Sequence, residues 1–161
     1  MTVRRWSAAL IFVGFMVPVA VQGEGSESTT REQARSAIEA GNIAWGQARV
    51  AIDTVAFERM LAPDLYVQLS SGQRLTRKQF IDEISNYAQG VSLTKFDASV
   101  LLIEPKGSDW TAIILEKLEF KIKAPDGKTE TRHATWVTRD GWRKVGGNRW
   151  LILFSEEVGH E

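Results

Sequence analysis

The amino-acid sequence predicts an α+β domain in which a mostly antiparallel sheet packs against three helices from the N-terminal half of the chain. Two observations carry this prediction. Helix caps and apolar residues at helical spacing occur only in the first half of the domain. The second half contains four long strand candidates separated by short turns, which is typical of an antiparallel meander.

The composition is that of an ordinary globular domain. The chain has 161 residues, 43% of them hydrophobic and 25% charged, which excludes disordered and fibrous classes. Lys and Arg number 20, as do Asp and Glu. This balance argues against nucleic-acid binding, which needs a basic surplus. The chain has no cysteine and only two histidines, so we expect no disulfide, no metal and no cofactor.

Residues 1–23 have the layout of a secretory signal peptide. Arg4 and Arg5 precede an apolar run over residues 8–21, which is too short to cross a hydrocarbon core of about 30 Å as a helix. Cleavage after Gly23 would leave small residues before the cut. We expect an exported protein, periplasmic or secreted, without stable membrane insertion after cleavage. An uncleaved membrane anchor is the alternative.

The mature chain divides into a polar linker over 24–29, one domain over 30–157 and a C-terminal tail over 158–161. Four long strands are expected in the second half of the domain, after a short strand in which Leu65, Val67 and Leu69 alternate with polar residues. The turn signals between the four strands are rich in Pro, Gly, Asp and Asn. The predicted strands cover roughly 92–104, 109–123, 129–145 and 149–157.

Three helices are expected at the start of the domain. Thr30 and Thr76 each begin a Thr-x-x-Gln capping box, and Asp53 is a suitable N-cap for a short helix between them. Pro63 is expected to end the second helix, because proline disfavours helical backbone at the residue before it. Gly90 is expected to end the third. The core-facing helix residues are predicted to be Ala34, Ile38, Gly41, Trp45, Ala48, Val55, Phe57, Met60, Leu61, Phe80, Ile81 and Ile84.

The Ala-Pro-Asp-Gly turn at 124–127 predicts the register of the central hairpin. This order of residues suits a type I turn with Gly127 in left-handed backbone, which places Glu116 opposite Trp136. A two-residue turn would shift the register by one and exchange the two faces. In the three-residue register, the face under the helices carries Trp110, Ala112, Ile114, Glu116, Leu118, Phe120, Arg132, Ala134, Trp136 and Thr138.

Glu116 and Arg132 are unusual on this largely apolar face. A carboxylate and a guanidinium must pair with each other, reach solvent or line a cavity, because burying either one dry and unpaired costs several kcal/mol. Trp136 stands opposite Glu116, and Trp45 lies on the inward stripe of the first helix. We expect Trp45, Glu116, Arg132 and Trp136 to line a ligand-binding pocket. An ion pair at the sheet edge, or an exposed Glu116, are the alternatives.

Three segments resemble the NTF2-like superfamily, and within it the DUF4440 group beside the SnoaL-like and ketosteroid-isomerase-like domains. They are Ala44–Arg49 with Asp53 and Leu61–Val67, then Gly72 with Leu75–Ile81, and finally Thr135–Val137 with Asn148–Phe154. The resemblance covers residues 30–157. It implies a cone-shaped roll in which a curved sheet wraps around three helices. A mostly apolar pocket at the open end and frequent homodimers are further implications.

The sequence departs from the ketosteroid-isomerase pattern at the catalytic base. The resemblance would place an aspartate near the end of the first strand, where this chain has Gln68, Leu69 and Ser70. Glu116 is the remaining candidate for a base. The favoured hypothesis is therefore an exported domain that binds a small apolar molecule. The alternatives are a cofactor-independent isomerase, cyclase or hydrolase acting on a polycyclic or lipid-like substrate, and a pocketless protein–protein module.

Overall fold

The computed structural model describes residues 29–87, 90–124 and 126–160. The expected signal peptide and all of the expected linker except Thr29 lie outside the described residues. Three helices precede most of the sheet, as the sequence predicts. The elements are α1 (Arg31–Ala51), α2 (Thr54–Met60), β1 (Leu61–Gln68), β2 (Arg74–Thr76), α3 (Arg77–Tyr87), β3 (Val91–Lys106), β4 (Asp109–Lys123), β5 (Thr129–Lys144) and β6 (Trp150–His160).

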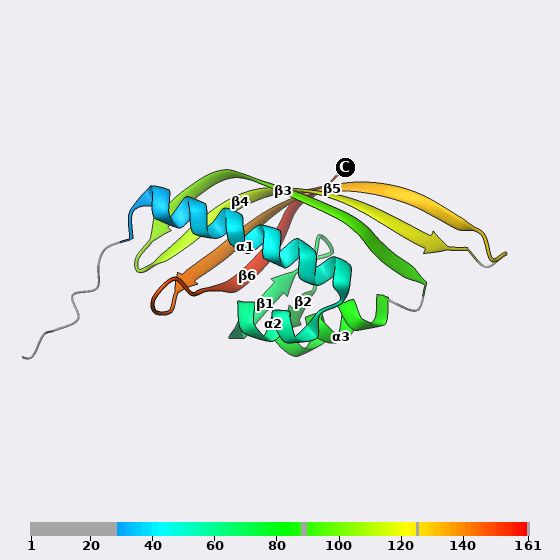
Figure 1. Ribbon diagram of the computed structural model, residues 1–161, viewed down its shortest axis with the longest axis horizontal. Helices are drawn as coiled ribbons and strands as arrows, with labels where there is room; N and C mark the ends of the chain where they lie inside the picture. Colours follow the sequence, from blue (N-terminus) through cyan, green and yellow to red (C-terminus); the bar gives the residue numbers. More distant parts are fainter. Residues whose placement is uncertain (1–28, 88–89, 125, 161) are drawn as a thin grey trace, which may run out of the picture.

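The strands form one curved six-stranded sheet in the order β2-β1-β6-β5-β4-β3. The pairs within β3–β6 are antiparallel, which confirms the predicted meander, whereas β1 pairs with β6 in parallel. Helix α1 crosses one face of the sheet, and α2 and α3 lie beside β1 and β2 (Figure 1). The α+β class with three helices on a curved, mostly antiparallel sheet is confirmed.

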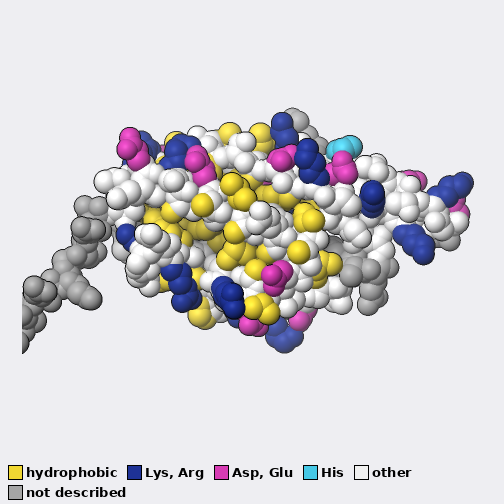
Figure 2. Space-filling model, in the orientation of Figure 1, with side chains coloured by type: hydrophobic (Ala, Val, Ile, Leu, Met, Phe, Trp, Pro, Cys, Tyr) yellow, Lys and Arg dark blue, Asp and Glu magenta, His cyan; other side chains and the backbone are white. Residues whose placement is uncertain are grey.

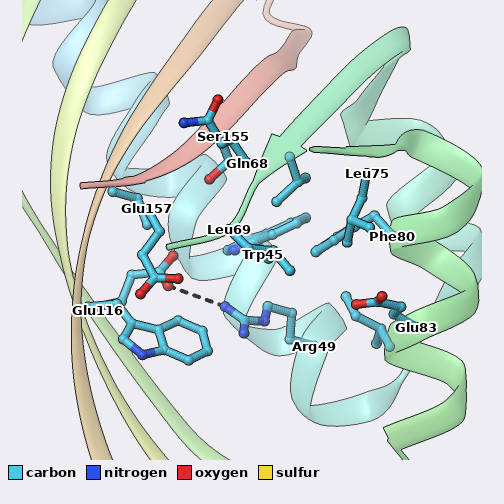
Figure 3. A pocket seen from close by; sticks show the side chains of 14 residues that line it. Trp45, Arg49, Gln68, Leu69, Leu75, Phe80, Glu83, Glu116, Ser155 and Glu157 are labelled. Carbon is cyan, nitrogen blue, oxygen red and sulfur yellow. Dashed lines mark hydrogen bonds and ion pairs between the residues drawn. The ribbon is translucent and has the colours of Figure 1, made fainter. Parts of the chain in front are cut away.

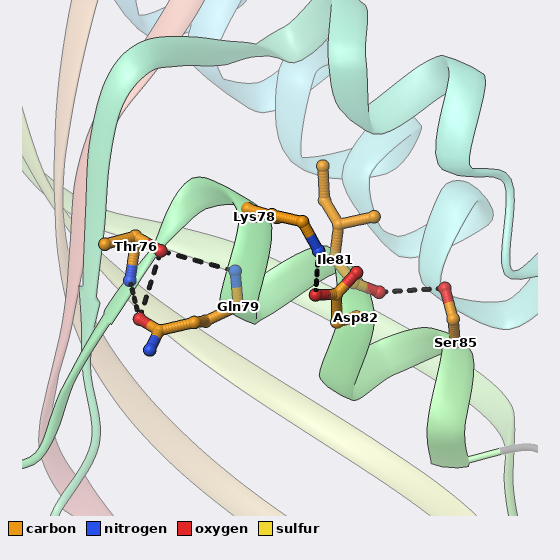
Figure 4. Close-up of polar contacts among 6 residues, drawn as sticks. All are labelled: Thr76, Lys78, Gln79, Ile81, Asp82 and Ser85. Carbon is orange, nitrogen blue, oxygen red and sulfur yellow. Dashed lines mark hydrogen bonds and ion pairs between the residues drawn. The ribbon is translucent and has the colours of Figure 1, made fainter.

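The predicted helix caps are present at all three helix starts. The Thr30 hydroxyl accepts a hydrogen bond from the backbone N–H of Gln33, whose side chain accepts one from the Thr30 N–H. Figure 4 shows the same reciprocal box between Thr76 and Gln79, with distances of 2.9 and 3.3 Å. The Asp53 carboxylate accepts from the N–H of the third helical residue of α2. Each cap satisfies backbone donors that the helix itself leaves unpaired.

Three boundaries differ from the sequence-based expectation. Helix α2 ends at Met60, and Pro63 lies inside β1. The pairing of β1 with β6 shifts register between Leu61 and Tyr66, so the proline, which has no N–H, falls in an irregular stretch of the ladder. Strand β6 continues to His160 and pairs there with β5, so residues 158–160 are strand rather than tail. Helix α3 ends at Tyr87, before Gly90.

The predicted register of the β4–β5 hairpin is confirmed. Glu116 pairs with Trp136, and Gly127 has φ +84°, the left-handed backbone that the type I turn requires. Figure 1 shows this hairpin extending beyond the helices at its turn end. Burial on the inward face follows this geometry, because Leu118 is buried whereas Arg132 is exposed. The part of the hairpin near the turn therefore has no helix over it.

The hydrophobic core lies between the inward sheet face and the helices. Trp45, Phe57 and Phe80 bring α1, α2 and α3 together, with Trp45 and Phe80 stacked at 5.3 Å between ring centroids. On the side of the molecule drawn in Figure 2, hydrophobic side chains gather along the middle of the surface, and most charged ones lie toward its rim. Among the described helices, none combines the length and apolar character needed to span a membrane.

Candidate functional site

A cavity of about 80 Å³ lies between α1, α3 and the inward face of the sheet. Its walls come from α1, α3 and the five strands β1, β2, β4, β5 and β6. Residues that are distant in sequence therefore meet there (Figure 3). Three of the four predicted site residues, Trp45, Glu116 and Trp136, line it. The other lining residues are Arg49, Val67, Gln68, Leu69, Leu75, Phe80, Glu83, Ile84, Thr138, Ser155 and Glu157.

The cavity contains a buried ion pair between the helix layer and the sheet. The Arg49 Nη1 atom of α1 donates a hydrogen bond to Glu116 Oε2 of β4 at 3.3 Å, and only 3% of the Glu116 side chain is exposed. Figure 3 shows the guanidinium pointing from the helix toward this carboxylate. A buried carboxylate needs such a partner, because the interior solvates its charge poorly.

Three aromatic rings surround the Arg49 guanidinium. Its central carbon lies 5.8 Å from the ring centroid of Trp45 and 5.4 Å from those of Phe96 and Trp136. The electron-rich faces of these rings attract a cation. Trp45 precedes Arg49 by four residues, so the helix itself places the indole and the guanidinium on the same face. The rings and Glu116 together hold the arginine in the cavity wall.

Two buried carboxyl groups on the inward face of the sheet, those of Glu116 and Asp140, have raised pKa values. Burial raises the pKa of Glu116, and Arg49 opposes this effect only in part. Burial, followed by the negative charge of Glu116, raises the pKa of Asp140 to about 7. Within the described part of the chain, Asp140 Oδ1 and the neighbouring Thr138 Oγ1 have no hydrogen-bond partner. Asp140 can therefore take up and release a proton near neutral pH.

Arg132 does not belong to this site, and its predicted role was wrong. The side chain is 65% exposed and forms an ion pair with Glu130, on the same strand. Arg132 stands opposite Phe120, four residues beyond the pair made by Glu116 and Trp136. At that distance from the cavity the hairpin has already passed the helices, so the arginine reaches solvent instead of the core.

The sequence reasoning missed four charged residues: Arg49, Glu83 and Glu157, which line the cavity, and Asp140, whose charge interacts with that of Glu116. Arg49 takes the place expected for Arg132, and the signal for it was its i+4 spacing from Trp45 on the first helix. Asp140 continues the inward alternation of Trp136 and Thr138, so extending the predicted face by two residues would have found it. Glu83 and Glu157, which also line the cavity, had no comparable signal in the sequence.

A wider hollow lies on the other side of α1, against the β5–β6 hairpin. Its volume is about 620 Å³, and its walls are mainly small and aromatic residues, among them Ala40, Gly41, Ala44, Trp142 and Trp150. It contains one charged side chain among its lining residues, whereas the smaller cavity has several polar groups that converge. Convergent polar groups in an enclosed apolar space are typical of ligand sites. The Arg49–Glu116 cavity is therefore the better candidate.

Across the part of the chain that the structure describes, no three His, Cys, Asp or Glu residues come together in a group suited to hold a metal ion.

Comparisons with known proteins identify the fold. No family model matches the sequence, and no curated protein is significantly similar to it. Among solved structures, an NTF2-like protein from Cytophaga hutchinsonii superposes with a TM-score of 0.63 at 17% identity, covering 78% of this chain and 97% of that one. A ketosteroid isomerase-like protein from Erwinia carotovora atroseptica gives 0.63 at 13% identity, covering 81% and 99%.

A third similar structure is the CaMKII hub of S. rosetta, with a TM-score of 0.59 at 14% identity and coverage of 78% of this chain and 95% of that one. Identities this low are informative about the fold and not about activity. The predicted architecture, the sheet order and these superpositions agree with one another. The chain has the NTF2-like fold.

Proposed function

We propose that this protein binds a small molecule in the cavity lined by Trp45, Glu116 and Trp136. One observation carries the proposal: a buried ion pair and three aromatic side chains border an enclosed space next to the core. A purely structural core would be closed at this position, because protein interiors pack at close to crystal density. Charged groups beside an open space are better suited to contact a ligand or ordered water.

The volume of the cavity limits the size of the ligand. Sites for drug-sized molecules measure about 300–1,000 Å³, whereas this space is about 80 Å³. The polycyclic or lipid-like substrates considered from the sequence do not fit a space of this size without rearrangement. The proposed ligand therefore has only a few non-hydrogen atoms inside the cavity.

A blocking variant tests the proposal. Leu69→Trp adds an indole at the cavity wall, while Leu101→Trp makes the same change at a 54% exposed position on β3. A fragment screen followed by NMR should find compounds that shift the indole signals of Trp45 and Trp136. Their binding should be lost in Leu69→Trp and kept in Leu101→Trp. Equal binding to both variants would contradict the proposed site.

A second function, general acid–base catalysis by Glu116, is favoured by one specific observation. Glu116 is buried at the cavity with a raised pKa, beside Asp140, whose pKa is about 7. A buried carboxyl group with a raised pKa is a suitable general acid or base. If Glu116 acts as a base, the protein should accelerate deuterium uptake at the α-carbon of a small ketone such as butanone. Glu116→Gln should abolish the acceleration, and equal rates would exclude this role.

We further propose that the protein is exported and loses residues 1–23. The support is the charged start, the short apolar run and the small residues that follow it in the sequence. Expression of the full chain in a bacterial host should give a periplasmic protein whose intact mass corresponds to residues 24–161. A mass that retains Met1 to Gly23 would contradict the proposal. The closer resemblance to the DUF4440 group also stays a prediction.

We infer a homodimer from the same resemblance, and a hub protein of similar fold is consistent with a homo-oligomer. The outer sheet face offers apolar surface for it, because Leu102 is 44% exposed beside Ile113 and Phe154, in a hollow of about 460 Å³. Sedimentation should give twice the chain mass. Leu102→Glu should shift the protein toward monomer, while a monomeric parent protein would contradict the inference.

A further inference from the structure

The lining of the cavity carries more negative than positive charge. Of the described residues around it, Glu83, Glu116 and Glu157 are acidic and Arg49 is the one basic residue. Arg49 and Glu116 compensate each other at 3.3 Å. If Glu116 takes up a proton, the remaining two carboxylates still outnumber the guanidinium. The cavity is therefore net negative in either protonation state of Glu116.

The two remaining carboxylates have weak partners. Glu157 Oε1 lies 3.3 Å from Nδ1 of His160, an exposed histidine, and its Oε2 accepts a hydrogen bond from the Ser70 N–H at 3.2 Å. Glu83 has no ion-pair partner among the described side chains. The negative charge of Glu157 also contributes to raising the pKa of Glu116, although burial is the main cause.

These carboxylates face the same space. Figure 3 shows the Glu157 side chain extending toward Glu116, and Glu83 on α3 lying across the cavity beyond Arg49. Like charges that converge in a poorly solvated space repel one another. A cation between the walls would remove this repulsion. The Arg49–Glu116 ion pair, whose charges cancel, would then lie next to this cation without repelling it.

The aromatic walls suit a cation with an apolar part. Trp45 and Phe80 are stacked almost parallel, at 9° between their planes, and Trp136 completes the wall from the sheet. The guanidinium of Arg49 already lies 5.4 Å from the Trp136 ring centroid, so these faces accept a positive group. Faces of this kind attract ammonium groups, and their edges bury alkyl carbons.

A separate observation shows an unused hydrogen-bonding group at the same cavity. Thr138 lines the cavity and is only 5% exposed, and its Oγ1 has no partner within the described chain. Buried hydroxyl groups in folded proteins almost always have a partner. An N–H donor or an ordered water in the cavity would supply one. The hydroxyl can therefore form a hydrogen bond with a polar occupant of the cavity, including one that carries N–H donors.

We propose that the cavity binds a small organic cation of the alkylammonium class, with its nitrogen between Glu83 and Glu157 and its carbon atoms against Trp45, Phe80 and Trp136. This inference rests on the proposed binding function and specifies the chemistry of its ligand. The carboxylates fix the charge of the ligand, the rings require an apolar part, and the cavity volume limits that part to a few carbons.

Three probes of equal chain length test the charge: butylammonium, 1-butanol and butyrate. Each is titrated into the purified protein while NMR follows the indole N–H signals of Trp45 and Trp136. The signal of Trp142, which lines the other hollow and not this cavity, is the internal control for binding elsewhere. Butylammonium should bind at least about tenfold more tightly than either other probe, because only it is attracted by the excess carboxylates.

Matched variants test the two carboxylates. Glu157→Gln and Glu83→Gln should each weaken butylammonium binding by about fivefold, since each removes one negative charge and keeps the side-chain shape. Glu130→Gln removes the same charge from the exposed hairpin and should change nothing. Glu83 lies on a surface helix, so its variant remains informative even if Glu157→Gln unfolds.

Each remaining outcome contradicts a different statement. If butyrate or 1-butanol binds as tightly as butylammonium, the ligand class is wrong while the binding function stands. If butylammonium binds but Glu83→Gln and Glu157→Gln behave like Glu130→Gln, the assigned carboxylates are wrong and the inference fails. If no probe, and no compound from the fragment screen, shifts Trp45 or Trp136, the proposed binding function itself fails.

Discussion

The guanidinium of Arg49 on α1 lies 3.3 Å from the carboxylate of Glu116 on β4, and this contact joins the helix layer to the sheet across 67 residues of sequence. The side chains are 11% and 3% exposed, so neither charge is well solvated by water. Removing one member of such a pair leaves the other uncompensated. The ion pair therefore links α1 to the sheet and also forms part of the wall of the proposed site.

Arg49→Met should destabilise the fold by about 3 kcal/mol at pH 8, because Glu116 loses its partner while its surroundings stay apolar. The loss should be smaller at pH 5. Burial already raises the pKa of Glu116, so the isolated carboxyl can take up a proton at lower pH and lose its charge. Urea unfolding at the two pH values measures both effects.

Arg35→Met is the matched control for this variant. Arg35 lies on the same helix and pairs with Glu39 at the surface, where its side chain is 41% exposed. Exposed pairs contribute little, so the control should lose less than about 1 kcal/mol at either pH. Equal losses in Arg35→Met and Arg49→Met would show that the Glu116 contact does not stabilise the fold.

Asp140 should make the protein less stable as the pH rises. The folded-state pKa of Asp140, about 7, is above the 3.8 of an ordinary aspartate, so between these two pH values the folded protein holds a proton that the unfolded chain releases. Stability is therefore full below about pH 4 and falls until about pH 7. The difference between these two pKa values corresponds to a loss of roughly 4 kcal/mol in the free energy of unfolding.

Asp140→Asn tests this directly, since the amide keeps the shape and cannot ionise. The variant should match the parent protein at pH 4 and be more stable than it at pH 8. Asp97→Asn, at an exposed position paired with Lys95, should leave the pH dependence unchanged. A parent protein whose unfolding free energy stays constant from pH 4 to pH 8 would contradict the burial of an ionisable Asp140.

Gly127→Ala should cost about 1 kcal/mol through backbone strain at φ +84°. A Cβ at this position would meet no other atom within 4 Å, so crowding contributes nothing to the loss. Gly90→Ala is the control, because Gly90 is equally uncrowded and does not have positive φ. Melting temperatures compare the two, and an unchanged value for Gly127→Ala would contradict the turn type.

Local patterns in the sequence were sufficient for most of the fold. The caps at Thr30, Asp53 and Thr76 depend on neighbours within three residues, and the 124–127 turn determined the hairpin register. The parallel pairing of β1 with β6 was not foreseen, because it joins segments about 90 residues apart. Strand β2 has only three residues, too few for a visible alternation.

The site was predicted less completely for a related reason. Alternation correctly placed Glu116 and Trp136 on the inward face, but it does not say how far the helices cover that face. Arg132 shares the face and still lies in solvent. The partner of Glu116 had to come from another layer, and the position of Arg49 over β4 depends on how α1 crosses the sheet. The spacing of residues in the sequence does not give the angle or the position at which α1 crosses the sheet.

Trp136, a wall residue of the proposed site, contrasts with Trp142, a buried residue that lines the other hollow. Both are inward residues of β5, but Trp136 is half-buried beside the cavity, whereas Trp142 is 2% exposed and packs so tightly that a Cβ on Gly41 would lie 2.7 Å from its ring. Trp142→Ala should cost the roughly 3–5 kcal/mol expected of a buried large aromatic residue. Trp136→Ala should cost less than about 3 kcal/mol, because part of its surface already faces open space.

The order of the two variants should reverse for ligand binding: Trp136→Ala, which loses less stability, should lose more affinity. Trp136→Ala removes an aromatic face from the proposed site and should weaken butylammonium binding, while the folded fraction of Trp142→Ala should bind as the parent does. Urea unfolding gives the stabilities, and NMR titration of the Trp45 indole signal gives the affinities. A stability loss above about 3 kcal/mol in Trp136→Ala, with unchanged binding, would make Trp136 a structural core residue and remove it from the site.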